Sequence, residues 1–124
     1  MPEFDTIAQR YIEVWNSTDA ASRRELIEAL FTPDATYTDP LGRAEGWDAI
    51  DALVGGAQEQ FAGLRFHLAQ PDSPVDGHHD IARFRWHLAP DATAEPVVIG
   101  FDVIVTADDH RISNVHGFLD KVPG

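Results

Sequence analysis

The sequence contains no cysteine, which excludes disulfide bonds, thiol nucleophiles, iron–sulfur clusters and thiolate zinc sites. Basic residues are also scarce: 9 Lys and Arg stand against 21 Asp and Glu, so the formal net charge is −12. A field of this sign repels phosphate backbones and anionic lipid, and we therefore expect neither nucleic acid nor a membrane surface as a partner. Any chemistry must come from carboxylates, histidines, hydroxyls or aromatic groups.

Long hydrophobic runs are absent as well. The most apolar stretch, residues 97–105, is interrupted by Gly100 and Asp102 and is far shorter than the roughly 20 residues that span a bilayer. Residues 1–10 lack the basic region and apolar core of a secretory signal, so we expect a cytoplasmic protein. A length of 124 residues with 44% hydrophobic content predicts a single domain over residues 1–124.

The first half of the chain has helical periodicity, with apolar residues at the i, i+3, i+4, i+7 spacing of amphipathic helices. The three predicted helices cover residues 4–15, 20–31 and 47–61. The polar segment 16–19 separates the first two helices and can cap the second, which Pro33 then ends. A short extended piece, residues 35–38, follows, and Gly63 lies beyond the end of the third helix.

After Gly63 the period changes to two and strand-forming residues dominate. The four predicted strands cover residues 64–70, 81–88, 97–106 and 111–119. Segments 71–80 and 89–96 are connectors rich in Pro and Asp, and residues 107–110 form a hairpin turn. The pattern predicts an α+β fold in which three N-terminal helices pack on a strongly curved, mainly antiparallel sheet, with a conical pocket between the layers.

Asp102 is the most unusual residue of this pattern, because both faces of its strand are apolar, which predicts burial on both sides. A buried carboxyl favours its neutral form, which raises its pKa and makes it a hydrogen-bond donor. Such a costly position is typical of a functional group. The structural alternative is that Asp102 reaches solvent or pairs with an arginine.

Tyr11 and Asp39 are two further candidates. Tyr11 shares the inward face of the first helix with Ile7 and Val14, so its hydroxyl needs a partner or a function. Asp39 directly precedes Pro40 in a turn. Both residues also have a purely structural interpretation, as a core aromatic and as a local turn former.

The six histidines do not have the spacing of a metal site. His78 and His79 are adjacent and therefore diverge, and His67, His87 and His116 are single positions in predicted strands. The sequence also lacks a glycine-rich phosphate loop and a nucleophile elbow. We expect no metal and no cofactor.

The strand at 81–88 alternates between two kinds of side chain. Arg83, Arg85 and His87 fall on one face, and Phe84 and Trp86 fall on the other. The charged face lies opposite the helices beside apolar neighbours, and small domains commonly cover such a face by isologous pairing. We therefore predict a homodimer.

Four segments together resemble the SnoaL-like proteins of the nuclear transport factor 2-like superfamily. These segments are Gln9-Arg10-Tyr11, residues 30–36, Asp39-Pro40-Leu41-Gly42 and Phe101-Asp102. The resemblance extends over about residues 7–122 and implies three helices against a curved sheet that encloses a conical pocket. Relatives within this superfamily include ketosteroid isomerase and polyketide cyclases.

The motif set is most similar to that of ketosteroid isomerase. By this resemblance, Asp39 matches a general base, Tyr11 an oxyanion-hole tyrosine and Asp102 a protonated oxyanion-hole acid. The implied function is abstraction of a proton alpha to a carbonyl in a hydrophobic small molecule, as in an isomerase or a polyketide cyclase. We expect a substrate pocket lined by the aromatic residues Trp15, Phe31, Trp47, Phe61, Phe84, Trp86 and Phe118. The alternative from a different class is a non-catalytic module that binds a hydrophobic ligand or dimerises.

Overall fold

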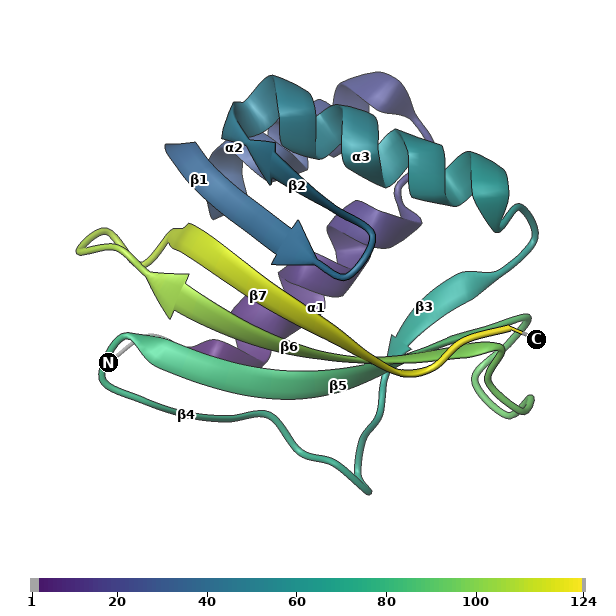
Figure 1. Ribbon diagram of the computed structural model, residues 1–124. Coiled ribbons are helices and arrows are strands. Elements are labelled where there is room, and N and C mark those ends of the chain that lie inside the picture. Colours follow the sequence, from purple (N-terminus) through teal and green to yellow (C-terminus); the bar gives the residue numbers. More distant parts are fainter. Residues whose placement is uncertain (1–2, 124) are drawn as a thin grey trace.

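Three helices lie on one side of a curved sheet in the computed structural model, which describes residues 3–123 (Figure 1). The helices are α1 (Phe4–Asn16), α2 (Ala20–Leu30) and α3 (Gly46–Gln60). Asp19 caps α2, as the polar break predicted, because its carboxylate accepts a hydrogen bond of 2.9 Å from the backbone N–H of Ser22. The expected end of α2 at Phe31 is wrong by one residue, since Phe31 is already extended and begins the first strand.

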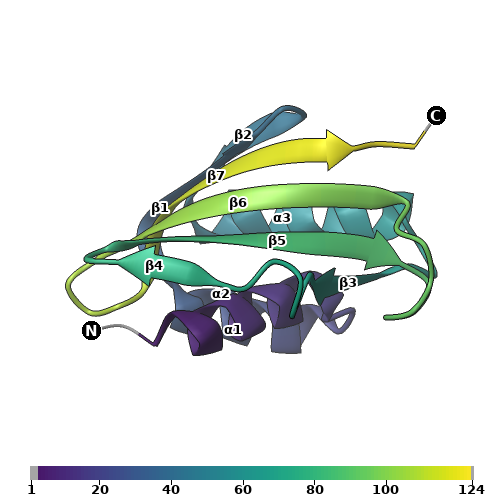
Figure 2. The ribbon, with the colours of Figure 1, turned by 90° about the horizontal axis from the view of Figure 1, so that it is seen from below.

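One mixed sheet forms the other layer, and Figure 2 shows its strands from below. The strands are β1 (Phe31–Asp39), β2 (Gly42–Glu45), β3 (Arg65–Leu68), β4 (Asp76–His78), β5 (Ile81–Ala89), β6 (Val98–Thr106) and β7 (Ile112–Lys121). Their order is β2-β1-β7-β6-β5-β3, with β4 paired to the free part of β5. Every pair is antiparallel except β1 with β7, which is parallel.

The α+β fold class is confirmed, and so is the antiparallel series β3, β5, β6 and β7. Two strands were not predicted: β2 follows the turn at Asp39, and β4 lies inside the expected connector 71–80. The extended piece expected at 35–38 is the end of a longer strand, which contains Pro33. Proline cannot donate to a ladder, and Pro33 lies in the segment where the register of β1 against β7 shifts.

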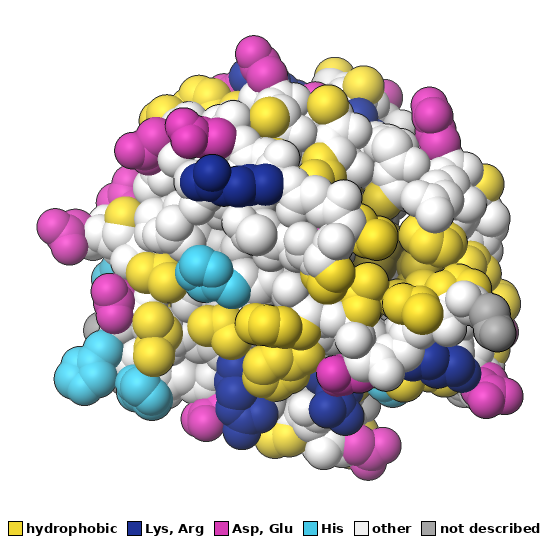
Figure 3. Space-filling model, viewed as in Figure 1, with side chains coloured by type: hydrophobic (Ala, Val, Ile, Leu, Met, Phe, Trp, Pro, Cys, Tyr) yellow, Lys and Arg dark blue, Asp and Glu magenta, His cyan; other side chains and the backbone are white. Residues whose placement is uncertain are grey.

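Strand β6 shows which way its side chains face. Gly100, Asp102 and Ile104 are buried on the helix side, whereas Phe101 and Val103 on the outer side are half-buried. The expectation of burial on both faces is therefore wrong for the outer face, because no helix of the described residues covers it (Figures 1 and 2). Figure 3 shows hydrophobic side chains gathered on this outer face over β6 and β7.

Two side-chain amides fix α1 against its neighbours. Asn16 donates to the carbonyl of Phe66 over 2.9 Å and accepts from its N–H over 2.8 Å, so it replaces a strand partner along the edge of β3. Gln58 of α3 donates to the carbonyls of Trp15 and Ser17 at the end of α1. These bonds fix the positions of Trp15 at the end of α1 and of Phe66 on β3.

Candidate active site

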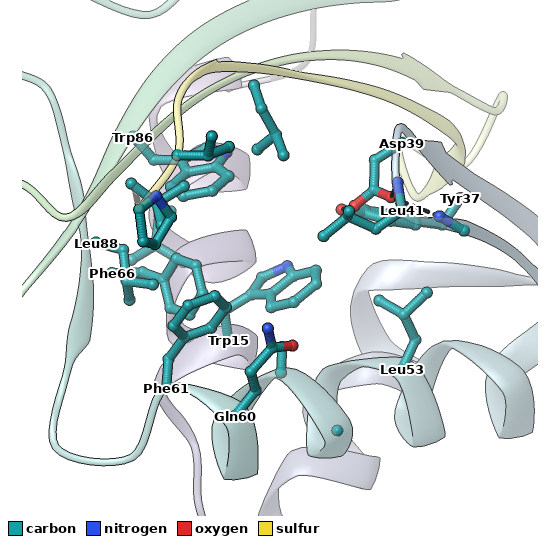
Figure 4. Close-up of a pocket in the computed structure, with 18 of the residues that line it drawn as sticks. Trp15, Tyr37, Asp39, Leu41, Leu53, Gln60, Phe61, Phe66, Trp86 and Leu88 are labelled. Carbon is teal, nitrogen blue, oxygen red and sulfur yellow. Dashed lines mark hydrogen bonds between the residues drawn. The ribbon is translucent and has the colours of Figure 1, made fainter.

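A cavity of about 610 Å³ opens between α1, α3 and the inner face of the sheet (Figure 4). This volume is in the usual range of small-molecule sites. Six aromatic residues lie on its wall: Tyr11, Trp15, Tyr37, Phe61, Phe66 and Trp86. Aliphatic residues, four of them leucines, make up most of the rest, and no Lys, Arg or His of residues 3–123 contributes to the lining. Figure 4 shows Asp39 facing this apolar wall across the cavity.

Asp39 lies at the end of β1 and is held by three donors. Its Oδ1 accepts the backbone N–H groups of Leu41 and Gly42 over 2.8 and 3.0 Å. Its Oδ2 accepts the hydroxyl of Tyr37 over 2.7 Å. The carboxylate forms no ion pair within the described part of the chain. The turn therefore orients a charged group at the cavity wall without neutralising it.

Asp102 is 2% exposed and lies behind the wall that Trp86 forms. The indole Nε1 of Trp86 donates to its Oδ2 over 3.1 Å. Burial raises the pKa of Asp102 to about 7, against the opposing effect of its Tyr11 and Trp86 neighbours. The carboxyl thus retains its proton to a much higher pH than an ordinary aspartate.

Gly100 allows this arrangement. It pairs with Trp86 across β5 and β6, and a Cβ atom on Gly100 would overlap the indole ring. Because the ring lies over the glycine, its Nε1 reaches Asp102, two residues along the same face of β6.

Gly117 lies between Asp102 and Asp39. It pairs with Asp102 across β6 and β7, and a Cβ atom on Gly117 would lie 2.9 Å from Oδ1 of Asp102 and 3.1 Å from Cβ of Asp39. The negative charge of Asp39 also contributes to the raised pKa of Asp102. Oδ1 of Asp102 and the Cβ atom of Asp39 therefore flank the narrow space that glycine leaves open.

Tyr11 completes the polar end of the cavity. Its ring is 2% exposed and packs edge-on against Phe84 at a centroid distance of 5.2 Å. Its hydroxyl is buried beside Asp102 but is not close enough or well enough aligned with any described group to form a hydrogen bond. Burial, followed by the charge of Asp102, raises the pKa of Tyr11 well above its usual value. The hydroxyl therefore stays protonated and can act as a hydrogen-bond donor.

Comparison with known proteins matches residues 8–115 to a model of the SnoaL-like domain. The chain belongs to the SnoaL-like family. It is similar to the structure of a candidate isomerase of this family from Agrobacterium tumefaciens, with 40% identity and a TM-score of 0.86 over 94% of this chain and 97% of the other.

Two more distant structures share the fold. One is a candidate polyketide cyclase from Sinorhizobium meliloti, with 23% identity and a TM-score of 0.63 over 90% of this chain and 93% of the other. The other has a ketosteroid isomerase-like fold and comes from Catenulispora acidiphila, with 14% identity and a TM-score of 0.69 over 90% and 82% of the two chains. At these identities the likeness concerns the fold alone. The search of curated proteins finds no match.

Of the three polar candidates, Tyr11 and Asp39 line the cavity, whereas Asp102 lies behind its wall, bonded to Trp86, which corrects the expectation that all three face it. Of the aromatic residues expected around a substrate, Trp15, Phe61 and Trp86 line it. The other four lie elsewhere, which corrects the expectation that they form the wall.

Phe31 and Phe84 belong to the core. Each is 1% exposed, and the ring of Tyr11 lies between them and the cavity, with centroid distances of 6.3 and 5.2 Å. The inward direction of both side chains was predicted correctly, but a residue behind the first layer of the wall cannot touch a ligand.

Trp47 and Phe118 face away from the cavity. Trp47 donates from Nε1 to the carbonyl of Phe31, and the guanidinium of Arg24 lies over its ring at 5.8 Å. Phe118 is 54% exposed on the outer face of the sheet, because strand alternation turns its neighbours Gly117 and Leu119 inward.

Tyr37 and Phe66 are cavity residues that the sequence analysis missed. A signal for Tyr37 was present: it precedes Asp39 by two positions, and residues i and i+2 of a strand share a face. Phe66 lies on an edge strand of four residues, where alternation is too short to indicate a face.

Residues 3–123 contain neither a cluster of metal ligands nor a helix suited to span a membrane. No three His, Asp or Glu side chains come together as metal ligands between residues 3 and 123. None of the helices described has the length and apolarity that a bilayer crossing requires.

Proposed function

We propose that this SnoaL-like protein is an enzyme that removes a proton alpha to a carbonyl in a neutral, hydrophobic small molecule. The observation that carries this proposal is an apolar cavity with one carboxylate and one tyrosine on its wall, the tyrosine hydroxyl being buried and unpartnered, and with a raised-pKa carboxyl directly behind that wall. Asp39 would be the base, and Tyr11 with neutral Asp102 would stabilise the enolate oxygen. Isomerisation, cyclisation and elimination all begin with this step.

The apolar wall supports both halves of the mechanism. Trp15, Phe66 and Trp86 make the region that Asp39 faces apolar, and an apolar environment strengthens hydrogen bonds to a developing negative charge. The Asp39 carboxylate also has no cationic partner among residues 3–123, so none of its oxygens is occupied by an ion pair. Oδ1 of Asp102, which does not accept the Trp86 bond, faces the gap beside Gly117.

Titration with 2-naphthol, whose ionised oxygen imitates an enolate, tests the assignment of donors. Asp102→Asn keeps a donor but weakens it, so affinity should fall by roughly 1–3 kcal/mol. Asp39→Asn should leave affinity unchanged or raise it. Asp5→Asn, on the exposed face of α1, is the matched control, since it removes the same charge far from the cavity. If neither site variant alters affinity, the mechanism is refuted.

Exchange of the alpha protons of 2-tetralone in deuterated water tests catalysis directly. The wild-type protein and Asp5→Asn should accelerate exchange, and Asp39→Asn should abolish the acceleration. Binding of 2-tetralone without accelerated exchange would contradict the proposed enzymatic function. It would favour the alternative, a non-catalytic module that binds hydrophobic ligands. One observation favours that alternative: Asp39 already has three donors inside the protein, as a purely structural turn residue would.

We also propose that two copies of the chain pair through the outer face of the sheet. Ile81 and Phe118 are exposed there by 37% and 54%, beside the half-buried Phe101 and Val103. An uncovered apolar sheet face of this kind is typically buried by a symmetric partner. Sedimentation should show a dimer at micromolar concentration and a monomer for Phe118→Lys. Leu41→Lys is the control, because Leu41 is 75% exposed at the cavity and not on this face.

A further inference from the structure

Tyr37 is a buried hydroxyl that the proposed reaction has not yet used. It lies on β1, is 4% exposed, and contributes to the cavity wall. Its hydroxyl donates to Oδ2 of Asp39 over 2.7 Å. Figure 4 shows the two side chains together on one side of the cavity.

Counting lone pairs identifies which oxygen of Asp39 can accept a proton. Each carboxylate oxygen offers about two acceptor sites. Oδ1 uses both for the N–H groups of Leu41 and Gly42, whereas Oδ2 accepts only from Tyr37 and keeps one site open. The basic atom is therefore Oδ2, the oxygen that Tyr37 holds.

The hydroxyl of Tyr37 also lies near the other polar groups of the site. Burial, followed by the charges of Asp102 and Asp39, raises the pKa of Tyr37 above its usual value, and the hydroxyl of Tyr11 is close enough to act on it as well. Tyr37 thus stays protonated between the base and the groups assigned to the enolate oxygen. It has one proton to donate and two possible acceptors.

The stronger acceptor changes during the reaction. Before proton transfer, Asp39 carries the charge and receives the Tyr37 hydrogen bond. In the transfer, the substrate C–H bond breaks, an O–H bond forms at Oδ2, and the electron pair moves to the carbonyl oxygen. Neutral Asp39 is then a weak acceptor, and the enolate oxygen is a strong one.

We propose that Tyr37 is a positioning residue that holds Oδ2 of Asp39 in the resting site and releases its hydroxyl toward the substrate oxygen once Asp39 is protonated. The inference rests on the proposed function. The base and the donors to the enolate are then coupled. When Asp39 gains a proton, the hydroxyl of Tyr37 becomes a third hydrogen-bond donor to the enolate oxygen.

The Asp39→Asn variant imitates the protonated base. Two backbone N–H groups hold the Oδ1 position, so the amide places its oxygen there and its NH₂ group toward Tyr37. An NH₂ group cannot accept a hydrogen bond, and the hydroxyl of Tyr37 becomes free for a ligand. Asp39→Asn should therefore raise the affinity for 2-naphthol roughly tenfold, about the effect of one charged hydrogen bond.

A double-mutant cycle tests the coupling. The gain from Asp39→Asn should shrink in the Tyr37→Phe background, where only the loss of the Asp39 charge still acts, and should persist in full in Tyr11→Phe, the matched loss of the other hydroxyl. An equal gain in the Tyr37→Phe background overturns the role of Tyr37 and leaves the proposed function standing. No effect of any variant on 2-naphthol affinity overturns both.

Proton NMR provides a second measurement in case Tyr37→Phe does not fold. The hydroxyl proton of Tyr37 is identified by its cross-peaks to the Tyr37 ring. In Asp39→Asn, addition of 2-naphthol should shift the resonance of this proton downfield. The same proton of the wild-type protein should move less, because Asp39 still competes for it. Equal shifts in both proteins would overturn the proposal.

Discussion

The indole ring of Trp86 occupies the space that a side chain on Gly100 would fill. This cross-strand contact sets the direction of Nε1 and thereby gives the buried carboxyl of Asp102 its one well-formed donor. The glycine is thus part of the site without touching a ligand, because the position of Trp86 depends on it.

Gly100→Ala should displace the indole and destabilise the protein by about 1–3 kcal/mol, the usual cost of overpacking. Urea denaturation, followed by tryptophan fluorescence, measures this loss. Gly56→Ala is the control: a Cβ there meets nothing within 4 Å, and the helix should gain about 0.5–1 kcal/mol. Equal stability of wild type and Gly100→Ala would show that Trp86 is free to move.

Asp102 should make stability fall with rising pH. The pKa of Asp102 is about 7 in the folded protein and near 3.8 when the chain is unfolded, so between these values only the folded state keeps the proton. The free energy of unfolding therefore decreases from about pH 4 to about pH 7, by on the order of 4 kcal/mol from this group. Asp102→Asn lacks the effect, so its stability relative to wild type should increase over that range. Parallel profiles of the two proteins would contradict the raised pKa.

The cavity should discriminate against anionic ligands. Asp39 is the one charged side chain on its described wall, and two like charges at close range repel by several kcal/mol at a protein surface, about 4 kcal/mol at 4 Å. Naphthalene-2-carboxamide should bind at least about tenfold more tightly than 2-naphthoate. The preference should shrink in Asp39→Asn and persist in Asp5→Asn. Equal affinities in the wild-type protein would mean that Asp39 does not face the ligand.

Asn16 should be important for stability although it is a helix-end residue. Asn16→Ala leaves the N–H and carbonyl of Phe66 without partners on the edge of β3, which should cost about 1–3 kcal/mol. Affinity for 2-naphthol should also fall, since Phe66 is part of the cavity wall. Ser17→Ala is the control, because Ser17 contributes its backbone carbonyl to the bond from Gln58. Urea denaturation that shows both variants equal to wild type would contradict the role of Asn16.

Local periodicity was sufficient to predict the direction of several side chains of the candidate site. The inward direction of Tyr11 follows from helical spacing, and that of Asp102 and Trp86 from strand alternation. The same reasoning fails for Phe31, since periodicity separates inside from outside but does not separate the cavity wall from the layer behind it.

Contacts between distant strands could not be predicted in this way. The overlap of Trp86 with Gly100 depends on the register of β5 and β6, and the gap at Gly117 depends on β1 beside β7. No local pattern determines these registers. By contrast, the bond from Tyr37 to Asp39 joins residues two positions apart on one strand, and alternation alone could have indicated it.

The parallel pairing of β1 with β7 has a consequence for biosynthesis. It joins Thr36 to Asn114, whose side chains are bonded across 78 positions of sequence, and it closes the wall to which Tyr11 contributes from the first helix and Leu119 from the last strand. During synthesis on the ribosome, the apolar faces of the helices therefore stay uncovered until β7 has emerged. Folding governed by such remote contacts is slow, and the nascent chain has to be kept from aggregating throughout that interval.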